Sequence, residues 1–458
     1  MAARLVDAAF AAVYLRLLGR ADVGAFTFLV VLTTYLDTLV DFGLNALLTR
    51  DVSRKSITAA QAFRSVNLMR LALWLVGFPI VLLVYGPLRE RADLSQEAAI
   101  AGWLFYFALL PTVLAKTASG VLWSAERLDL TAGVSVLATF MKTAVGVAVL
   151  FAGFGMIGLA LASLLTNVVT AVLLWRLASL SRPLHETDEH ASRPLMPWLR
   201  EAWPLFINQL LQGLFFKIDA LLLPGLAGDV AAGTYAAAYK VSEGAGIISS
   251  SFTLALFPRL SRETDLSHAY RLALRALLQM AIPLAVGIGL LSEPIVALVG
   301  GREYLPDSAV ALSILICYLP FSYANGLTQY VLIAAGKQRM LTGAFAVALV
   351  FNLVANLLLI PRFSYVGAAW VTVASELVLL VPFRMAAASV TRRVSLRQEA
   401  RTPLLATLLM APVVWWLRDA LHPLAAIPAG AAVYLLALWS LGGIDAAQRR
   451  LLLQFVRP

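Results

Sequence analysis

The sequence predicts an all-α polytopic membrane protein, and its composition, its mean hydropathy and its long apolar runs each point to that class. Of the 458 residues, 60% are AVILMFWYC and only 14% are Asp, Glu, Lys or Arg. Soluble domains are roughly half apolar and a quarter charged. With a mean hydropathy of +0.82, the chain carries too little charge to cover a water-facing surface. A soluble enzyme is therefore excluded, and many bilayer spans are expected.

A spanning helix needs about 20 mostly apolar residues, and runs of this kind give fourteen candidate spans. They lie near residues 2–18, 25–46, 67–86, 98–120, 131–152, 155–177, 201–223, 233–257, 273–299, 308–333, 340–360, 364–386, 402–418 and 423–441. Polar or Gly/Pro breaks separate them, for example RDVSRKS after the second, SAERLD after the fourth and GGREYLPD after the ninth. The first span is the weakest, because it is short, contains Asp7 and ends at Arg16.

The lysines and arginines give the expected orientation, because short cytoplasmic loops are enriched in them. With the N-terminus inside, 26 of the 36 fall on the inner side, in a set that includes Arg70 and Lys116, and seven on the outer side. Both termini are therefore expected to be cytoplasmic. The remaining three are Lys142, Lys217 and Lys240, which fall inside expected spans.

Two parts of the chain repeat at an offset of 209 residues. Gly24 and Arg50 match Gly233 and Arg259, and FGMIGLA from Phe154 matches FSYVGAA from Phe363. Six spans per unit make these parallel repeats, which predicts an N-lobe and a C-lobe around a central cavity. We expect a six-helix bundle over residues 1–180, a cytoplasmic linker over 181–200, a second bundle over 201–390, and two more helices with a cytoplasmic tail over 391–458.

Several functional classes are excluded by what the sequence lacks. It contains no G-x-x-x-x-G-K-[ST] phosphate loop, no G-x-G-x-x-G fingerprint and no H-E-x-x-H zinc motif. His185 and His190 of the linker sit among acidic residues, but without a structured scaffold we expect no metal site there. A non-enzymatic secondary transporter or a channel-like scaffold remains.

The lysines within the spans are the candidate contacts for an anionic substrate, because an ionisable group in the membrane needs a cavity or a partner. Lys142 has no carboxylate within one helical turn, which leaves a cavity or substrate role, an acid on another helix, or snorkelling. Lys217 and Asp219 are two residues apart and point to different faces, so a cavity-facing Lys217 and a structural pair both stay open. Lys240 and Glu243 have the spacing of an intrahelical ion pair, which we favour over ligand contact.

The acids within the spans are candidates for ion coupling or for pairing with a cation. Asp37 and Asp41 share one helix face and can hold a proton or a cation between them, although simple hydration also suits Asp41 near the expected cytoplasmic end. Glu376 is a lone acid in the middle of its span. We expect it to pair with a buried lysine rather than to carry a proton.

The chain resembles a known family at several short motifs. YLRLLGRADVGAFTF from Tyr14 and DFGLNALLTRDVSR from Asp41 are similar to the opening of Wzx-type polysaccharide repeat-unit flippases of the multidrug/oligosaccharidyl-lipid/polysaccharide (MOP) exporter superfamily. In the second half, KIDALLLPGLAGDVAAGTYAAAYKVSE from Lys217 and ALFPRLSR from Ala255 resemble the same family. The resemblance covers nearly the whole chain but departs at the first helix, which is shorter than the family norm.

This resemblance implies a fourteen-span transporter for O-antigen or exopolysaccharide synthesis. It would flip an undecaprenyl-pyrophosphate-linked oligosaccharide from the cytoplasmic to the periplasmic leaflet of the bacterial inner membrane by alternating access. The expected partners are that glycolipid, membrane lipids and other polysaccharide assembly proteins, with no nucleic acid. We expect a monomer without cofactor, with H⁺ or Na⁺ coupling as an open option.

Two other functions remain as alternatives. An ion-coupled multidrug or cation antiporter of the same superfamily would favour intramembrane acids, and the three intramembrane lysines count against it. A membrane glycan polymerase or ligase would usually need an ordered outer loop to hold its acceptor, whereas no expected outer loop exceeds about a dozen residues.

Overall fold

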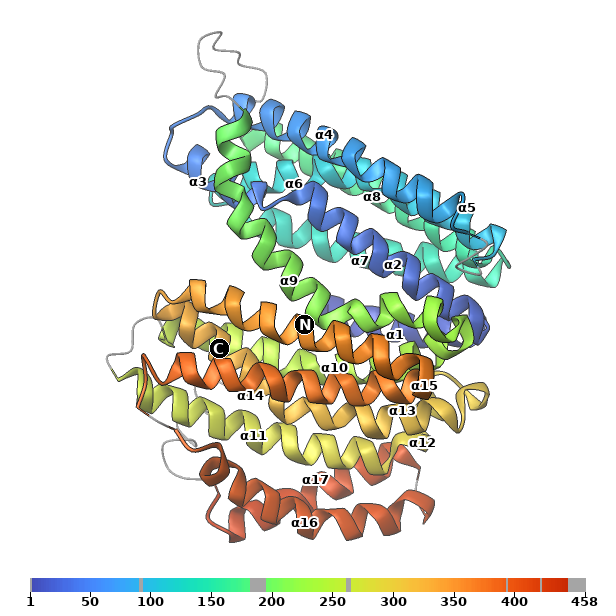
Figure 1. Cartoon of the computed structure of the whole chain (residues 1–458), viewed down its shortest axis with the longest axis vertical. Coiled ribbons are helices and arrows are strands. Elements are labelled where there is room, and N and C mark those ends of the chain that lie inside the picture. The colour runs from blue at the N-terminus through green and yellow to red at the C-terminus, as the bar shows by residue number, and fades with distance from the viewer. Residues whose placement is uncertain are drawn as a thin grey trace. The chain divides into compact units, whose positions relative to one another are not determined.

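The computed structural model describes residues 2–89, 94–181, 195–260, 265–392, 394–420 and 422–443, and these ranges fold as helices joined by short turns (Figure 1). The chain divides into two compact units, Met1–Gly233 and Thr234–Pro458. The first unit holds α1 (Ala2–Leu17), α2 (Arg20–Asp41), α3 (Leu44–Ser53), α4 (Ala59–Tyr85), α5 (Gln96–Phe107), α6 (Leu109–Ser124), α7 (Leu128–Phe151), α8 (Gly155–Ser181) and α9 (Leu195–Ala227).

The helix α10 (Asp229–Leu260) begins in the first unit and continues into the second. The second unit also holds α11 (Leu266–Leu290), α12 (Ser292–Val299), η1 (Arg302–Tyr304), α13 (Asp307–Leu315), η2 (Ile316–Tyr318), α14 (Leu319–Ala334), α15 (Gln338–Ala387), α16 (Leu396–Ala420) and α17 (Pro423–Ser440).

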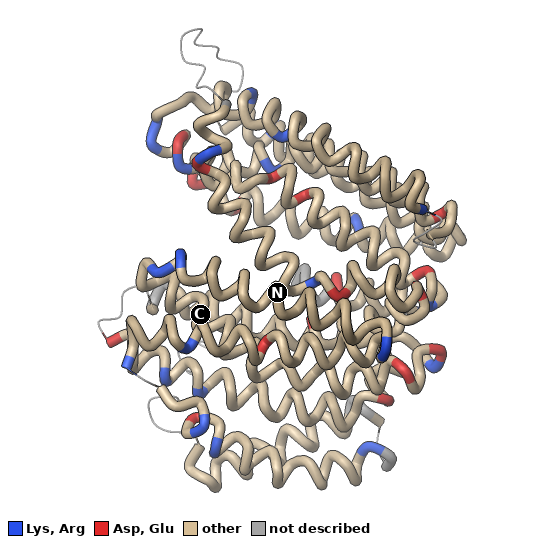
Figure 2. Tube along the Cα trace, in the orientation of Figure 1, with Lys and Arg blue, Asp and Glu red and all other residues tan. Residues whose placement is uncertain are grey.

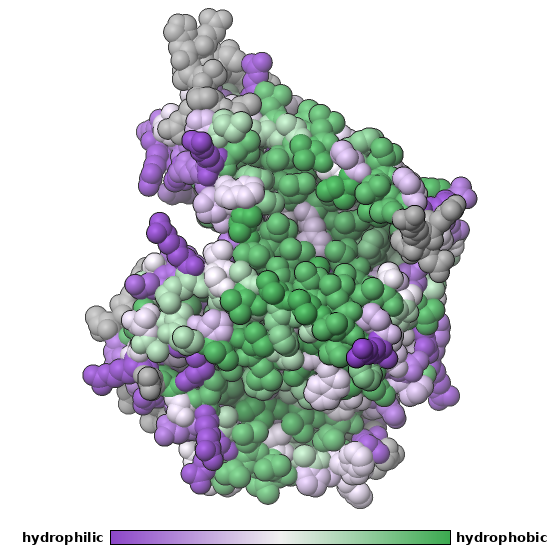
Figure 3. Space-filling view, in the orientation of Figure 1, coloured by the Kyte–Doolittle hydropathy of each residue, from purple (hydrophilic) through white to green (hydrophobic). Residues whose placement is uncertain are grey.

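Each of the fourteen expected spans coincides with one or more of these helices, which confirms the all-α polytopic class. Within the described ranges, ten helical segments are long and apolar enough to cross a membrane. The two spans expected at 340–360 and 364–386 are two helices that share the label α15, and a kink at Ser364, where φ is 52°, separates them. Exposed apolar side chains such as Leu75, Val350 and Trp416 cover the helices, and Figure 3 shows a largely apolar face. The charged residues gather toward the helix ends (Figure 2).

The chain breaks between α2 and α3 and again between α5 and α6, inside two of the expected spans. Phe42 and Gly43, with φ of 49° and 75°, turn the chain between α2 and α3. Both lie in the left-handed region, which glycine enters without steric cost. The break between α5 and α6 falls at Ala108, whose carbonyl accepts a hydrogen bond from Asn167 Nδ2 at 3.1 Å. Pro111 lacks the N–H that would continue the helical ladder across this break.

The start of α4 lies earlier than the span expected at residue 67. Thr58 and Gln61 form a capping box, in which the side chain of each bonds the backbone N–H of the other at 3.2 Å. Such a box satisfies two of the unpaired N–H groups at a helix start, so the helix begins at Ala59. The residues that follow the cap therefore lie inside a long helix rather than in a loop.

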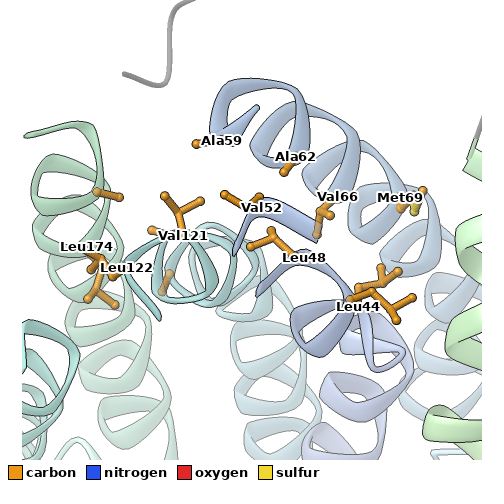
Figure 4. Close-up of a cluster of buried hydrophobic side chains, with 14 of the residues drawn as sticks. Leu44, Leu48, Val52, Ala59, Ala62, Val66, Met69, Val121, Leu122 and Leu174 are labelled. Carbon is orange, nitrogen blue, oxygen red and sulfur yellow. The ribbon is translucent and has the colours of Figure 1, made fainter. Parts of the chain in front are cut away.

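A cluster of buried apolar side chains holds α3, α4, α6 and α8 together. Figure 4 shows Leu44, Leu48 and Val52 of α3 facing the α4 side, with Leu122 of α6 and Leu174 of α8 in the same cluster. Burial of aliphatic side chains in a close-packed interior is what fixes the relative position of these helices.

The helix α9 packs on the first unit rather than standing apart from it. Phe206 of α9 stacks on Phe42 with ring centroids 4.3 Å apart, and Arg50 of α3 forms an ion pair with Glu201. The sequence predicts that residues from 201 onward belong to the second bundle. Spatial packing of α9 does not test the sequence repeat, so the repeat boundaries stay a prediction.

In the second unit, α16 and α17 form a pair that packs on α11. Met410 and Val414 of α16 and Tyr434 of α17 belong to one buried cluster with Leu291. The Tyr434 hydroxyl donates a hydrogen bond to the Gln279 carbonyl of α11 at 2.7 Å.

A very close helix contact joins α2 to the first turn of α10. A Cβ atom added to Gly24 would lie 2.0 Å from the carbonyl oxygen of Asp229, and one added to Gly233 would lie 1.8 Å from that of Arg20. Only glycine fits at either position, so the two backbones are in direct contact here. These two glycines are also the pair that the repeat matched.

Candidate functional site

Four charged side chains of the first unit form one cluster within its helices, and we call it the charge cluster. It consists of Asp37 and Asp41 from α2, Arg70 from α4 and Lys116 from α6. The guanidinium of Arg70 is 2.6 Å from Asp41 Oδ1, and Lys116 Nζ is 2.7 Å from Asp37 Oδ2 and 3.9 Å from Asp41 Oδ1. Two acids and two cations thus balance one another.

Arg70 is the inner member of the charge cluster, with a side chain that is 0% exposed. Its Nη1 donates to Thr117 Oγ1 at 2.7 Å, and its Nη2 donates to Asp41 Oδ1 at 2.6 Å. Thr117 in turn donates to Asn67 Oδ1 at 2.7 Å. A charge at this depth is tolerated only with partners of this kind, so Arg70 is held in place by α2, α4 and α6 together.

Lys116 and Asp37 form the open side of the charge cluster. Their side chains are 32% and 30% exposed, against 14% for Asp41. Because this ion pair is partly accessible, an incoming anion can compete with Asp37 for the ammonium, and a proton or cation can compete with Lys116 for the carboxylate. The arrangement is therefore suited to exchanging charged partners at a fixed position.

The sequence predicts the acids of the charge cluster as site residues, but it wrongly places the two cations with the inner loops. The expected span starts at residue 67, which places Arg70 near a loop. The capping box starts α4 at Ala59, which puts Arg70 well inside the helix. The expected inner loop at Lys116 is helical instead, because α6 continues to Ser124. The Thr58–Gln61 box was the signal in the sequence that would have revealed the first of these errors.

The three lysines singled out from the sequence come from different helices. Lys142 lies exposed on α7, which packs on α8, α1 and α6, whereas the half-buried Lys217 lies on α9, which packs on α2 and α3. Asp219 is buried and Lys217 is partly open. Lys240 lies on α10 and forms the predicted pair with Glu243 at 2.8 Å.

Glu376 lies on α15 in the second unit and is 3% exposed. Its Oε2 accepts a hydrogen bond at 2.6 Å from Asn325 Nδ2 of α14, which also donates to the Glu376 carbonyl at 2.9 Å. No lysine lies within ion-pair distance of it among the described residues, so the expected pairing with a lysine is not found. A neutral amide takes that place.

Metal ligation finds no support in the part of the chain that the structure describes, where no three His, Cys, Asp or Glu side chains come together. His185 and His190 of the expected linker lie outside the described residues.

The chain is similar to known protein families and to individual relatives. The sequence profile of the family described as "polysaccharide biosynthesis protein" matches residues 1–263, and that of the MatE family matches residues 204–358. The chain is 24% identical over 339 residues to "Probable flippase AglR" of Haloferax volcanii, with 72% of this chain and 69% of that protein covered. It is 27% identical over 194 residues to "Putative O-antigen transporter" of Shigella dysenteriae. This match covers 41% of this chain and 48% of that protein.

Solved structures share the fold. "Lipid II flippase MurJ, inward closed conformation" matches with a TM-score of 0.77 at 13% identity, covering 95% of this chain and 96% of the other. A multidrug resistance MATE family transporter of the MOP superfamily, in an inward-facing conformation, matches with a TM-score of 0.63 at 16% identity, covering 84% and 95%. These likenesses show that the fold is shared, and the two family profiles support the superfamily that the motifs indicated. Because its profile spans more than half of the sequence, the chain belongs to the polysaccharide biosynthesis protein family.

Proposed function

We propose that this protein is a flippase that moves a lipid-linked oligosaccharide, carried on undecaprenyl pyrophosphate, from the cytoplasmic to the periplasmic leaflet of the bacterial inner membrane. The observation that carries this proposal is the charge cluster with its accessible Lys116–Asp37 pair, within a chain of the polysaccharide biosynthesis protein family. The names of two relatives, a probable flippase and a putative O-antigen transporter, support the same reading.

The proposed cycle uses exchange of partners at the Lys116–Asp37 pair. A phosphate oxygen of the substrate replaces Asp37 at Lys116, and a proton or sodium ion replaces Lys116 at Asp37. The exchange keeps the charges balanced, which matters because an unpaired charge in the membrane costs at least a few kcal/mol. Arg70 stays on Asp41 throughout and holds the site together.

Further cationic contacts and the motion of the cycle are part of the same proposal. Lys142, Lys217 and Lys240 are candidates to contact the sugar-phosphate along its path, and alternating access of two six-helix lobes would supply the movement. Both termini would be cytoplasmic, and the glycan would cross in a hydrated cavity while the polyprenyl tail stays in lipid.

The second candidate function is an ion-coupled multidrug or cation antiporter. It is favoured by the MatE profile over residues 204–358 and by the two acids of α2 that a cation could contact. An enzyme acting on the same glycolipid, a polymerase or ligase, has no comparable support.

Deletion of the gene followed by extraction of polyprenyl-linked glycans tests the proposal. A flippase predicts that complete repeat units accumulate on the cytoplasmic side and that surface polysaccharide is lost. Unchanged surface polysaccharide together with new sensitivity to cationic drugs would reject the flippase in favour of the antiporter.

Substitution of Lys116 tests its role within the flippase. Lys116→Gln is expected to lower export of polysaccharide at least about tenfold, because a charge-assisted hydrogen bond to phosphate contributes roughly 1.5–3 kcal/mol. Lys142→Ala should also lower export if it contacts the substrate. Surface polysaccharide is measured in the deletion strain complemented with each variant, with immunoblots of the membrane fraction as the measure of protein level.

Two further variants make this test discriminating. Lys337→Gln removes an exposed lysine between α14 and α15 and should leave export unchanged. Asp37→Asn imitates the protonated carboxylate of the proposed exchange and leaves Lys116 to the substrate, so export should fall less than with Lys116→Gln. Equal loss with Lys116→Gln and Asp37→Asn would instead mean that the ion pair serves the structure alone or that Asp37 is itself essential.

A further inference from the structure

A groove of about 740 Å³ runs along the outside of the first unit between α4 and α8, with α6 as its floor. Both α4 and α8 pack on α6, which begins directly after the break at Ala108 and carries Pro111 in its first turn. Leu68 and Leu71 of α4 form one wall, Val168 and Val172 of α8 form the other, and Leu114 lies between them.

The lining of the groove is apolar and open to the surroundings. Leu68 is 53% exposed and Val172 is 43% exposed, and the neighbouring apolar side chains are similarly open. All of them belong to helices that are long and apolar enough to span the bilayer. A lipid hydrocarbon chain is therefore the natural occupant of this space, because water would leave these side chains unfavourably solvated.

A cation marks one end of the groove. Arg64 lines it less than two turns after the start of α4, and Trp175 of α8 lines it near the end of that helix. At 1.5 Å per residue, Arg64 lies about 8 Å from the first residue of α4 and Leu71 about 18 Å, so the apolar part extends deeper than the guanidinium. Arg64 has no hydrogen-bond or ion-pair partner among the described residues, and its side chain is exposed. A cation and a tryptophan at the membrane interface are the groups that contact lipid headgroups.

We propose that this groove binds one anionic phospholipid, with its phosphate at Arg64 and an acyl chain between α4 and α8 against α6. The combination of a partner-free guanidinium at the end and an apolar channel leading inward matches the two halves of such a lipid. A zwitterionic lipid fits the channel equally well but gains less from the single cation.

The groove reaches the charge cluster through one side chain. Asn67 lines the groove, and its Oδ1 accepts the Thr117 hydroxyl that in turn accepts from Arg70. A lipid in the groove therefore packs against a residue that helps to hold Arg70. Lipid binding would stabilise the charge cluster and so regulate transport; this regulatory step rests on the proposed function, whereas the binding itself does not.

Native mass spectrometry of the purified full chain tests the binding. The protein in mild detergent is titrated with dioleoylphosphatidylglycerol or dioleoylphosphatidylcholine, and the fraction carrying one lipid is compared. Arg64→Gln is expected to weaken phosphatidylglycerol binding about fivefold, the effect of losing one basic residue at an anionic surface. Val172→Trp, which fills the channel, should weaken binding of both lipids.

The control is Arg54→Gln, which removes an exposed arginine after α3 that does not line the groove, and it should leave binding unchanged. Equal binding of the two lipids by the natural protein, or equal losses with Arg64→Gln and Arg54→Gln, would overturn the proposal. The readout involves no transport, so a failure here is distinguishable from a failure of the flippase function. If binding is confirmed, reduced export by Arg64→Gln in cells would support the regulatory step, and unchanged export would reject that step.

Discussion

Replacement of Arg70 by methionine is expected to lower the free energy of unfolding by about 3 kcal/mol, because it leaves Asp41, which is only 14% exposed, without its closest cation. The value lies at the lower end of the range for breaking a buried pair, since Lys116 is 3.9 Å from Asp41 and compensates in part. The loss also removes the donor to Thr117. Unfolding in mixed micelles with increasing SDS, followed by tryptophan fluorescence, measures the change.

Two further variants separate loss of the ion pair from loss of packing. Arg64→Met alters an exposed arginine on the same helix and should change stability by less than about 0.5 kcal/mol. The double variant Arg70→Met with Asp41→Asn removes both charges and should recover much of the lost stability. If the double variant is as unstable as Arg70→Met alone, the unpaired Asp41 charge is not the cause.

Replacement of Gly24 by alanine is expected to destabilise the first unit by about 3 kcal/mol, the upper end of the usual cost of overpacking. The new Cβ atom would lie 2.0 Å from the carbonyl oxygen of Asp229, and a backbone atom cannot move aside as the end of a side chain can. The backbones at Gly24 and Asp229 would have to separate. The midpoint of thermal unfolding in detergent, measured by loss of the monodisperse peak, should fall clearly.

Gly133→Ala is the matched control, because Gly133 also lies inside a helix but has open space around its Cβ position. Alanine there should be neutral or stabilising by up to about 1 kcal/mol, owing to its higher helix propensity. A similar loss in both variants would mean that the contact of Gly24 with α10 is not what makes glycine necessary.

The spans could be predicted from the sequence because the requirement for about 20 apolar residues is local. The helix breaks inside two of these spans were not predicted, because they depend on the backbone conformation and hydrogen bonds of a few residues. The α2–α3 turn rests on two left-handed residues, Phe42 and Gly43, and the α5–α6 break rests on a long-range bond from Asn167. Neither changes the hydropathy of its segment, so apolar runs alone do not reveal them.

In the candidate site, contacts within one helix could be predicted from the sequence, whereas contacts between helices could not. The Lys240–Glu243 pair follows from spacing along one helix, and it was predicted correctly. The charge cluster joins α2, α4 and α6, so its pairing depends on tertiary packing that the sequence does not display. Its acids were recognised, but the cations could be assigned only with helix boundaries in hand. Likewise, the partner of Glu376 is an asparagine on another helix, where charge balance had suggested a lysine.

The order of the charge cluster along the chain has a consequence for biogenesis. Asp37 and Asp41 leave the ribosome with α2, Arg70 follows with α4, and Lys116 comes only with α6. Each ionised side chain placed alone in the bilayer costs at least a few kcal/mol. Insertion of these helices one at a time is therefore unfavourable, and α2 and α4 reach their lowest free energy only after α6 has joined them. The cluster thus makes membrane insertion of the first six helices a cooperative event.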